Sequence, residues 1–291
     1  MTRAGFAAVS LVIVATAATG AAAALAPPNE KLAMVTVVAD QAKAATGLTP
    51  ADFAITEDKD RVDVTEAIPA KDPLSVVLLV DTALPADGSA ATPELRKGLT
   101  AFVSTVLAGE PGAQIAIYKV ANAAIPVKDF MSSPAGLEDG INLITSGTAA
   151  GSAMLEGVAT AARRIADRPA PRRAIVCLGI GTAEGTAMQP REIGDLVRKA
   201  GATLWVVSVQ SSTDAALTNR DTVWTRVTED TGGLRQNVVQ ATRLEGRMQS
   251  VANSLLSQYV LKMVRKQDGA VKGFKGKTTQ GLQVLFTRWV R

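Results

Sequence analysis

The stretch Pro73-Leu74-Ser75-Val76-Val77-Leu78-Leu79-Val80-Asp81 decides the fold. It is a short run of β-branched residues and leucines that ends in a carboxylate, and the turn-forming residues Pro85, Asp87 and Gly88 follow it. A strand that is apolar on both faces must be covered on both faces, so this run predicts the centre of a parallel α/β sheet. Because ligands of such sheets bind beyond the carboxyl ends of the strands, Asp81 marks the first place to look for a functional site.

Strands and helices alternate after this central run, which predicts a doubly wound, mostly parallel sheet. Further strands are expected at 114–120, 124–130, 174–178 and 203–209. The strand at 124–130 is expected at an edge, because Pro126 cannot donate a hydrogen bond inside a sheet. The hydroxyl of Thr92, with Pro93 behind it, predicts a capped helix start. Other helices are expected at 135–144, 152–166, 191–200 and 242–258, and a shorter one before 231–233.

Alternating apolar and polar residues flank this α/β region and predict β structure at both ends. Strands are expected at 34–40, 53–58 and 61–66, and closing strands at 259–264 and 281–286. The predicted organisation is a signal peptide at 1–26, a small β-rich module at 27–70, an α/β domain at 71–240 and a C-terminal helix and β-strand extension at 241–291.

The N-terminus has the pattern of an export signal. Met1-Thr2-Arg3 carries one positive charge, an apolar segment runs from Ala4 to about Ala18, and small residues follow. This pattern predicts a secretory signal peptide that is cleaved near Ala22 to Ala26, and therefore a periplasmic or secreted protein. The alternative is an apolar segment that is retained as a membrane anchor.

Composition excludes several classes of function. The chain has 291 residues, a net charge of +4 and only 4% aromatic residues, which argues against nucleic-acid binding. It contains no histidine, which excludes Ser-His-Asp and Cys-His nucleophiles and His-ligated metals. The single cysteine, Cys177, lies in an apolar run and is expected to be a buried thiol. The glycines of 179–185 lack the spacing of a nucleotide-binding loop. Since no acid–base or nucleophile–base pair can be assembled, the chain is not expected to be an enzyme.

Basic residues gather near the C-terminus, and two interpretations remain open. One is a weak electrostatic contact with anionic lipid or a cell-wall polymer. The other is a solvated hairpin whose lysines guard an exposed sheet edge. The residues are Lys262, Arg265, Lys266, Lys272, Lys275, Lys277, Arg288 and Arg291.

Four segments together resemble a known family, the exported bacterial proteins with a von Willebrand factor type A domain of the VWFA-related type. Val35-Thr36-Val37 and the Gly47–Asp58 segment, which contains Asp52-Phe53, are similar to the β module that precedes this domain. Thr231-Gly232-Gly233 and Ser257-Gln258-Tyr259-Val260-Leu261 are similar to its closing segments. The resemblance implies a von Willebrand factor type A fold over essentially all of the chain after the signal peptide.

The family's usual activity depends on a site for Mg²⁺ or Mn²⁺ at the top of the sheet, and the resemblance implies where its ligands would fall. Asp81 matches the first ligand, and Thr148 corresponds to the threonine. Ala83 and Pro85 stand at the two serine positions, and Ile180 stands at the second aspartate. Three of the five positions therefore lack an oxygen-bearing side chain, which does not suit a cation that demands near-octahedral oxygen ligands.

Two functions remain in competition. The favoured one is a metal-independent module without a cofactor, in which Asp81 caps backbone N–H groups and the rim loops bind a protein or cell-envelope partner. The alternative is a cation-dependent adhesion-type receptor with an irregular site on Asp81 and Thr148. Other oxygen-bearing residues of the predicted rim are Asp87, Ser89, Thr182 and Glu184.

Overall fold

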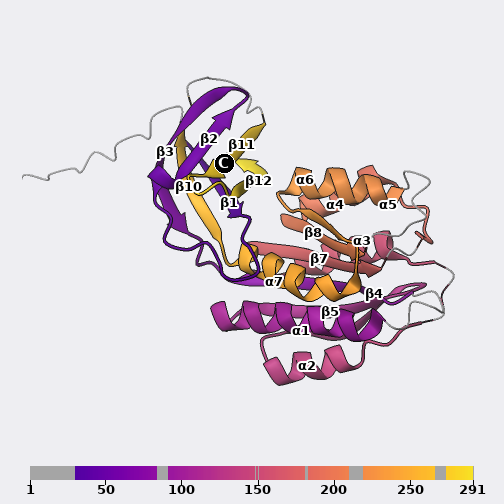
Figure 1. Cartoon of the computed structure of the whole chain (residues 1–291). Coiled ribbons are helices and arrows are strands. Elements are labelled where there is room, and N and C mark those ends of the chain that lie inside the picture. Colours follow the sequence, from indigo (N-terminus) through magenta and orange to yellow (C-terminus); the bar gives the residue numbers. More distant parts are fainter. Residues whose placement is uncertain are drawn as a thin grey trace, which may run out of the picture.

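Strand β4 (Leu74–Asp81) lies at the centre of a six-stranded sheet, and every one of its residues is buried. The computed structural model describes residues 30–83, 91–147, 149, 151–180, 183–209, 219–265 and 273–290. It consists of an α/β domain built on this sheet and a β-barrel beside it (Figure 1). The central position predicted for the apolar run is therefore confirmed.

The sheet of the α/β domain is parallel except at one edge. β6 pairs antiparallel with β5, and all other neighbours are parallel. The strands lie in the order β6 (Ala124–Met131), β5 (Gln114–Val120), β4, β7 (Arg172–Ile180), β8 (Ala202–Val209) and β9 (Arg235–Val238). The mixed α/β class, the mostly parallel sheet and the edge position of the strand with Pro126 agree with the sequence prediction.

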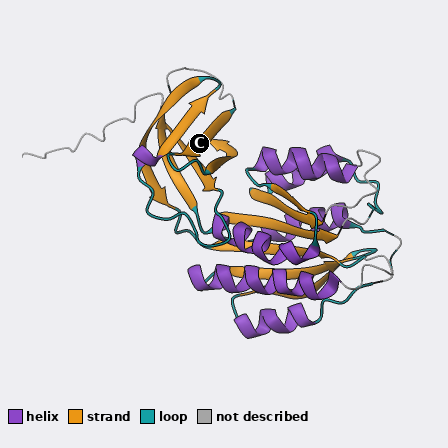
Figure 2. Ribbon diagram, in the orientation of Figure 1, coloured by secondary structure: helices purple, strands orange, loops and turns teal. Residues whose placement is uncertain are grey.

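Helices cover both faces of this sheet, which explains why its strands are apolar throughout (Figure 2). One face packs against α1 (Thr92–Gly109), α2 (Pro134–Asn142) and α7 (Leu244–Leu255). The other packs against α3 (Met154–Ala166), α4 (Pro190–Lys199) and a segment made of α5 (Asn219–Thr222), the π-helical turn η3 (Val223–Val227) and α6 (Thr228–Thr231). Within the described residues, no helix is long and apolar enough to cross a membrane.

The barrel combines strands from both ends of the described chain, and the sequence pattern does not predict this pairing. It closes in the order β1, β10, β3, β2, β11, β12 around its own apolar core. Its strands are β1 (Glu30–Val37), β2 (Phe53–Glu57), β3 (Asp60–Pro69), β10 (Gln258–Val264), β11 (Phe274–Thr278) and β12 (Gln283–Val290), with the 3₁₀ turn η1 (Pro50–Asp52) before β2. The N-terminal β module and the C-terminal strands are thus parts of one closed sheet.

The barrel overturns one interpretation of the C-terminal lysines. Lys275 and Lys277 lie on β11, which pairs with β2 on one side and β12 on the other. They are exposed, but they do not guard a free sheet edge, because β11 has none. The interpretation was wrong because the partner strand β2 lies more than two hundred residues away in the sequence.

The start of α1 also differs from the prediction. Ala91 occupies the N-cap position, and Thr92 is the first residue inside the helix. The Thr92 hydroxyl is buried without a hydrogen-bond partner among the described residues, so it does not cap the helix. The proline one residue inside the helix start is as expected.

A single buried arginine, Arg172 at the start of β7, joins the barrel to the α/β domain. Its Nε donates to Gln258 Oε1 of β10 at 2.8 Å, and Gln258 in turn donates to Thr36 of β1. Its Nη1 lies 2.6 Å from the Glu110 carboxylate that follows α1. Its remaining bonds go to the carbonyl oxygens of Ala70, Asp72 and Leu255. The guanidinium therefore fixes both chain crossings between the two parts.

We expect Arg172→Ala to lower the free energy of unfolding by about 3 kcal/mol or more, because it leaves a carboxylate and three carbonyl groups without their donor. Arg164→Ala is the matched control, since Arg164 is 49% exposed and its ion pair with Asp129 lies at the surface. Its cost should stay below about 1 kcal/mol. Urea unfolding of both variants measures the difference, and equal costs would contradict a joining role for Arg172.

Candidate functional site

Asp81 begins the site at the carboxyl end of β4, where its side chain is completely buried. Its Oδ1 accepts a hydrogen bond from the backbone N–H of Ala83 at 3.1 Å, as the capping interpretation predicted. The loop is also fixed by its backbone, because Thr82 N–H donates to Val120 and Gly147 N–H donates to Thr82. The loops at the carboxyl ends of the strands, called the rim here, are therefore fixed by backbone hydrogen bonds around Asp81.

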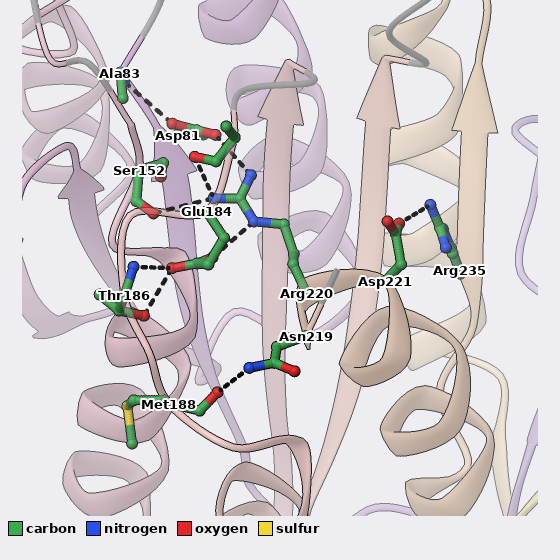
Figure 3. Close-up of polar contacts among 11 residues, drawn as sticks. Asp81, Ala83, Ser152, Glu184, Thr186, Met188, Asn219, Arg220, Asp221 and Arg235 are labelled. Carbon is green, nitrogen blue, oxygen red and sulfur yellow. Dashed lines mark hydrogen bonds and ion pairs between the residues drawn. The ribbon is translucent and has the colours of Figure 1, made fainter. Parts of the chain in front are cut away.

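The guanidinium of Arg220 faces this carboxylate (Figure 3). Its Nη1 lies 3.7 Å from Asp81 Oδ2, and its Nε donates to Glu184 Oε2 at 2.7 Å. Its Nη2 donates to the carbonyl oxygens of Ser152 at 3.1 Å and Ala183 at 3.4 Å. The side chain is 10% exposed, so the top of the sheet contains a buried positive charge between two buried carboxylates.

Polar contacts on both sides hold the short helix α5, which carries Arg220. Asn219 Nδ2 donates to the carbonyl oxygen of Met188 at 3.2 Å. Asp221 forms an ion pair with Arg235 of β9 at 3.0 Å. Figure 3 shows these contacts on either side of Arg220, so the guanidinium is aimed by the turn that bears it.

Glu184 is held as firmly as Arg220. Its Oε1 accepts hydrogen bonds from the Thr186 hydroxyl at 2.8 Å and from the Thr186 backbone N–H at 3.3 Å. A parallel β-bridge pairs its backbone with Ser152. Only 5% of its side chain is exposed. One carboxylate oxygen of Glu184 thus accepts hydrogen bonds from Thr186 of its own loop, and the other accepts a hydrogen bond from Arg220.

Burial raises the pKa of the Asp81 carboxyl to about 6 from its ordinary value of 3.8. The positive charge of Arg220 lowers this pKa and the negative charge of Glu184 raises it, but the cost of burying the charge is larger than either. The cluster of one guanidinium and two carboxylates therefore gains a proton more readily than an exposed aspartate does.

The structure brings together two of the six residues predicted for the rim, Asp81 and Glu184. The other four predicted residues lie outside the described residues: Asp87, Ser89, Thr148 and Thr182. Arg220, which contacts both Asp81 and Glu184, was not predicted. The only signal in the sequence is a basic residue after the loop that follows β8, at the same edge of the sheet as Asp81.

The described residues do not fit the divalent cation that the resemblance implies. Ala83 lies buried where an oxygen ligand is expected, and a guanidinium already faces Asp81. Within the described part of the chain, no group of three or more His, Cys, Asp or Glu side chains is placed to hold a metal ion. A cation beside Arg220 would also meet its positive charge at close range.

Two other predicted features have clear places in the structure. Cys177 is a free, buried thiol in β7, and burial raises its pKa, so it is not activated as a nucleophile. Of the C-terminal basic residues, Arg265 is buried and forms two hydrogen bonds with Glu57. Lys262 pairs with Glu30 and Glu66. These two cations therefore form ion pairs within the barrel. Lys266, Lys272 and Arg291 lie outside the described residues, and the side chain of Arg288 is not described.

Solved structures similar to this chain include von Willebrand factor type A domains, which confirms the resemblance at the level of the fold. A von Willebrand factor type A protein from Catenulispora acidiphila matches with a TM-score of 0.52 and 10% identity, over 88% of this chain and 72% of that protein. The vWF domain of the type V pili tip protein Mfa5 from Porphyromonas gingivalis gives 0.51 and 11%, over 64% and 96%. Proximal thread matrix protein 1 from the mussel byssus gives 0.52 and 16%, over 69% and 50%. No protein-family model matches the chain, and no curated protein is similar to it in sequence.

The raised pKa of Asp81 predicts a specific dependence of stability on pH. The folded protein binds this proton more tightly than the unfolded chain, so the stabilisation is complete below pH 3.8 and is lost as the pH rises through about 6. Asp81→Asn mimics the neutral acid and removes this dependence. The stability of the variant relative to the wild type should rise by up to about 3 kcal/mol between pH 4 and pH 7.5.

Asp129→Asn supplies a control of opposite sign, because a hydrogen bond from the backbone N–H of Phe130 lowers the pKa of Asp129. Since the pKa of Asp129 lies below 3.8 in the folded protein, its stability relative to the wild type should fall as the pH rises from about 2 to about 4. It should change little between pH 4 and pH 7.5, where Asp81→Asn changes most. Denaturant unfolding at a series of pH values measures both variants. If the stability difference between Asp81→Asn and the wild type does not change with pH, burial does not raise the pKa of Asp81.

Proposed function

We propose that this von Willebrand factor type A fold serves as an exported, non-catalytic interaction module that binds a protein or cell-envelope partner without a bridging metal ion. The observation that carries the proposal is the guanidinium of Arg220, bound to Glu184 at 2.7 Å and facing Asp81 at 3.7 Å. A positive charge that belongs to the chain itself stands against the carboxylate that corresponds to the first metal ligand.

This arrangement changes what the rim can offer a partner. A cation-dependent site keeps one coordination position open for an acidic group of the partner. Arg220 instead directs its donors at Glu184 and at the carbonyl oxygens of Ser152 and Ala183. Its charge is engaged inside the protein, so recognition at the rim relies on direct contacts with the loops.

Two further points support a binding role. The chain has no histidine, and its single thiol is buried with a raised pKa, so neither supplies the usual nucleophile or base. Two structural neighbours are a pili tip protein and a matrix protein of byssal threads. These neighbours fit the export that the N-terminal sequence predicts, and the proposal extends an interaction role to this chain.

The first test is thermal unfolding with EDTA and then with millimolar Mg²⁺, Mn²⁺ or Ca²⁺. A ligand at 100 times its dissociation constant adds about 2.7 kcal/mol of stability, which a melting curve detects easily. We expect no shift in the melting temperature with any of these cations. An EDTA-reversible shift that Asp81→Ala abolishes would contradict the proposal and establish the cation-dependent receptor instead.

The second test removes the internal cation. Arg220→Ala leaves Asp81 and Glu184 buried without a positive charge, and we expect a loss of about 3 kcal/mol or more in stability. Millimolar Mg²⁺ or Mn²⁺ should restore part of this loss in the variant and leave the wild type unchanged, because the two carboxylates then accept an external cation. Neutralising Asp81 and Glu184 as Asn and Gln in the same variant should restore stability without metal.

Arg220→Lys is the matched control, since it keeps the charge but loses the planar fork of donors. It should be less destabilised than Arg220→Ala and should not respond to divalent cations. If Arg220→Ala is as stable as the wild type at every cation concentration, Arg220 does not balance the two carboxylates and the proposal loses its main support.

A further inference from the structure

A groove of about 930 Å³ lies beside the edge strand β9, between the α/β domain and the segment that follows β1 of the barrel. Its walls are residues 38–42, which follow β1, and residues 236–240, at the end of β9. Arg243, just before α7, Arg247 and Ser250 of α7, and Leu282 complete the lining. A volume of this size is within the range of ligand-binding clefts, which often occur where two parts of a chain meet. None of the residues that line the groove belongs to the cluster around Arg220.

The strand along this groove has an open edge. β9 ends the sheet, and no described strand pairs with its outer side. The carbonyl oxygen of Leu234 accepts from Val206 of β8, so it points inward. Because backbone groups alternate along a strand, the N–H and C=O groups of Arg235 and Asn237 point outward. An open row of this kind is a template for another strand.

The charges beside this edge are positive. Arg243 and Arg247 are exposed, lie one helical turn apart, and form no ion pair with any described residue. The one acidic side chain of the lining, Asp40, is turned to its own loop, where its Oδ1 accepts from the N–H groups of Ala42 and Lys43. The groove therefore presents two exposed guanidinium groups that pair with no described carboxylate, and such groups suit an external carboxylate.

A buried acceptor adds an independent indication. The side-chain Oε1 of Gln236 is shielded from solvent, belongs to the lining of the groove, and has no hydrogen-bond partner among the described residues. A buried carbonyl oxygen without a donor is costly, and the N–H group of a bound peptide would satisfy it. Val239, at the end of the strand, leaves 82% of its surface exposed and offers an apolar contact next to the open edge.

We infer that this groove binds an extended, acidic segment of a partner protein, which adds as a strand to the outer edge of β9. The outward groups of Arg235 and Asn237 pair with the backbone of the segment. Arg243 and Arg247 bind one of its acidic side chains. Backbone pairing supplies affinity for any extended chain, and the two arginines supply the preference for acidic ones.

The test is selection of random octapeptides displayed on phage against the full chain, followed by fluorescence anisotropy of one enriched synthetic peptide. We expect enriched sequences with an acidic residue between β-branched or aromatic residues. The double substitution Arg243→Glu and Arg247→Glu should weaken binding of that peptide by about tenfold or more. Asn237→Pro should weaken it too, because proline removes an outward N–H that the native ladder does not use.

The matched control makes the same change in charge on another face, with Arg191→Glu and Lys199→Glu on α4, both exposed. Binding should be unchanged in this control, and circular dichroism and melting curves should show that all variants fold. Failure to enrich acidic peptides, or equal loss in the control and the groove variant, would overturn the proposal. Loss with the arginine variant but not with Asn237→Pro would show that a carboxylate binds without strand addition, which also overturns it.

Discussion

Burying a guanidinium is tolerated only when its charge and its donors are all matched, and this constraint organises the molecule at three places. Arg172 is matched by Glu110, Gln258 and carbonyl groups where the barrel meets the α/β domain. Arg220 is matched by Glu184 and Asp81 at the top of the sheet. Arg265 is matched by two bonds to Glu57 at the end of β10. Each arginine ties together segments far apart in the sequence, so the geometry of the chain crossings and of the rim follows from satisfying these charges.

At the rim, this constraint decides which chemistry the fold can perform. A bound metal ion and a fixed guanidinium both balance buried carboxylates, but they differ in what remains free. A metal ion can keep an open coordination position for a partner, whereas the donors of Arg220 are directed at groups of the same chain. The pKa of Asp81 is raised mainly because the carboxyl is buried, and the positive charge of Arg220 only partly offsets this cost. The charged groups at the rim are therefore paired within the chain, and burial of the Asp81 carboxylate still lowers the stability of the folded protein.

The sequence predicts the parts of this structure that depend on local pattern. The apolar run of β4 predicts a central strand because both of its faces must be buried. Asp81 is then predicted at the carboxyl end of that strand. The barrel escapes prediction because β1 pairs with β10 and β12, more than two hundred residues away, and periodicity carries no information about such pairing. β9 has only four residues, and β11 alternates lysine with glycine, so neither has the pattern of a buried strand. Arg220 is not predicted because the metal-site motif specifies only oxygen-bearing ligands. It gives no information about a basic side chain that could take the place of the cation.

The hydrogen-bonding state of the polar groups also indicates where a partner could bind. Groups that are already satisfied inside the protein gain little from a partner, whereas unsatisfied groups gain a full interaction. At the rim, both oxygens of Glu184 are engaged by Arg220 and Thr186, whereas Asp81 Oδ2 and Ser152 Oγ are buried without a hydrogen-bond partner among the described residues. The edge of the sheet adds groups that a partner can reach, because the outward backbone groups of β9 lie beside the exposed Arg243 and Arg247 and the unpartnered oxygen of Gln236. Arg235 of β9 also holds Asp221, the neighbour of Arg220. A strand added at this edge would therefore contact the element that fixes the internal cation, which places the open edge and the rim on one continuous piece of structure.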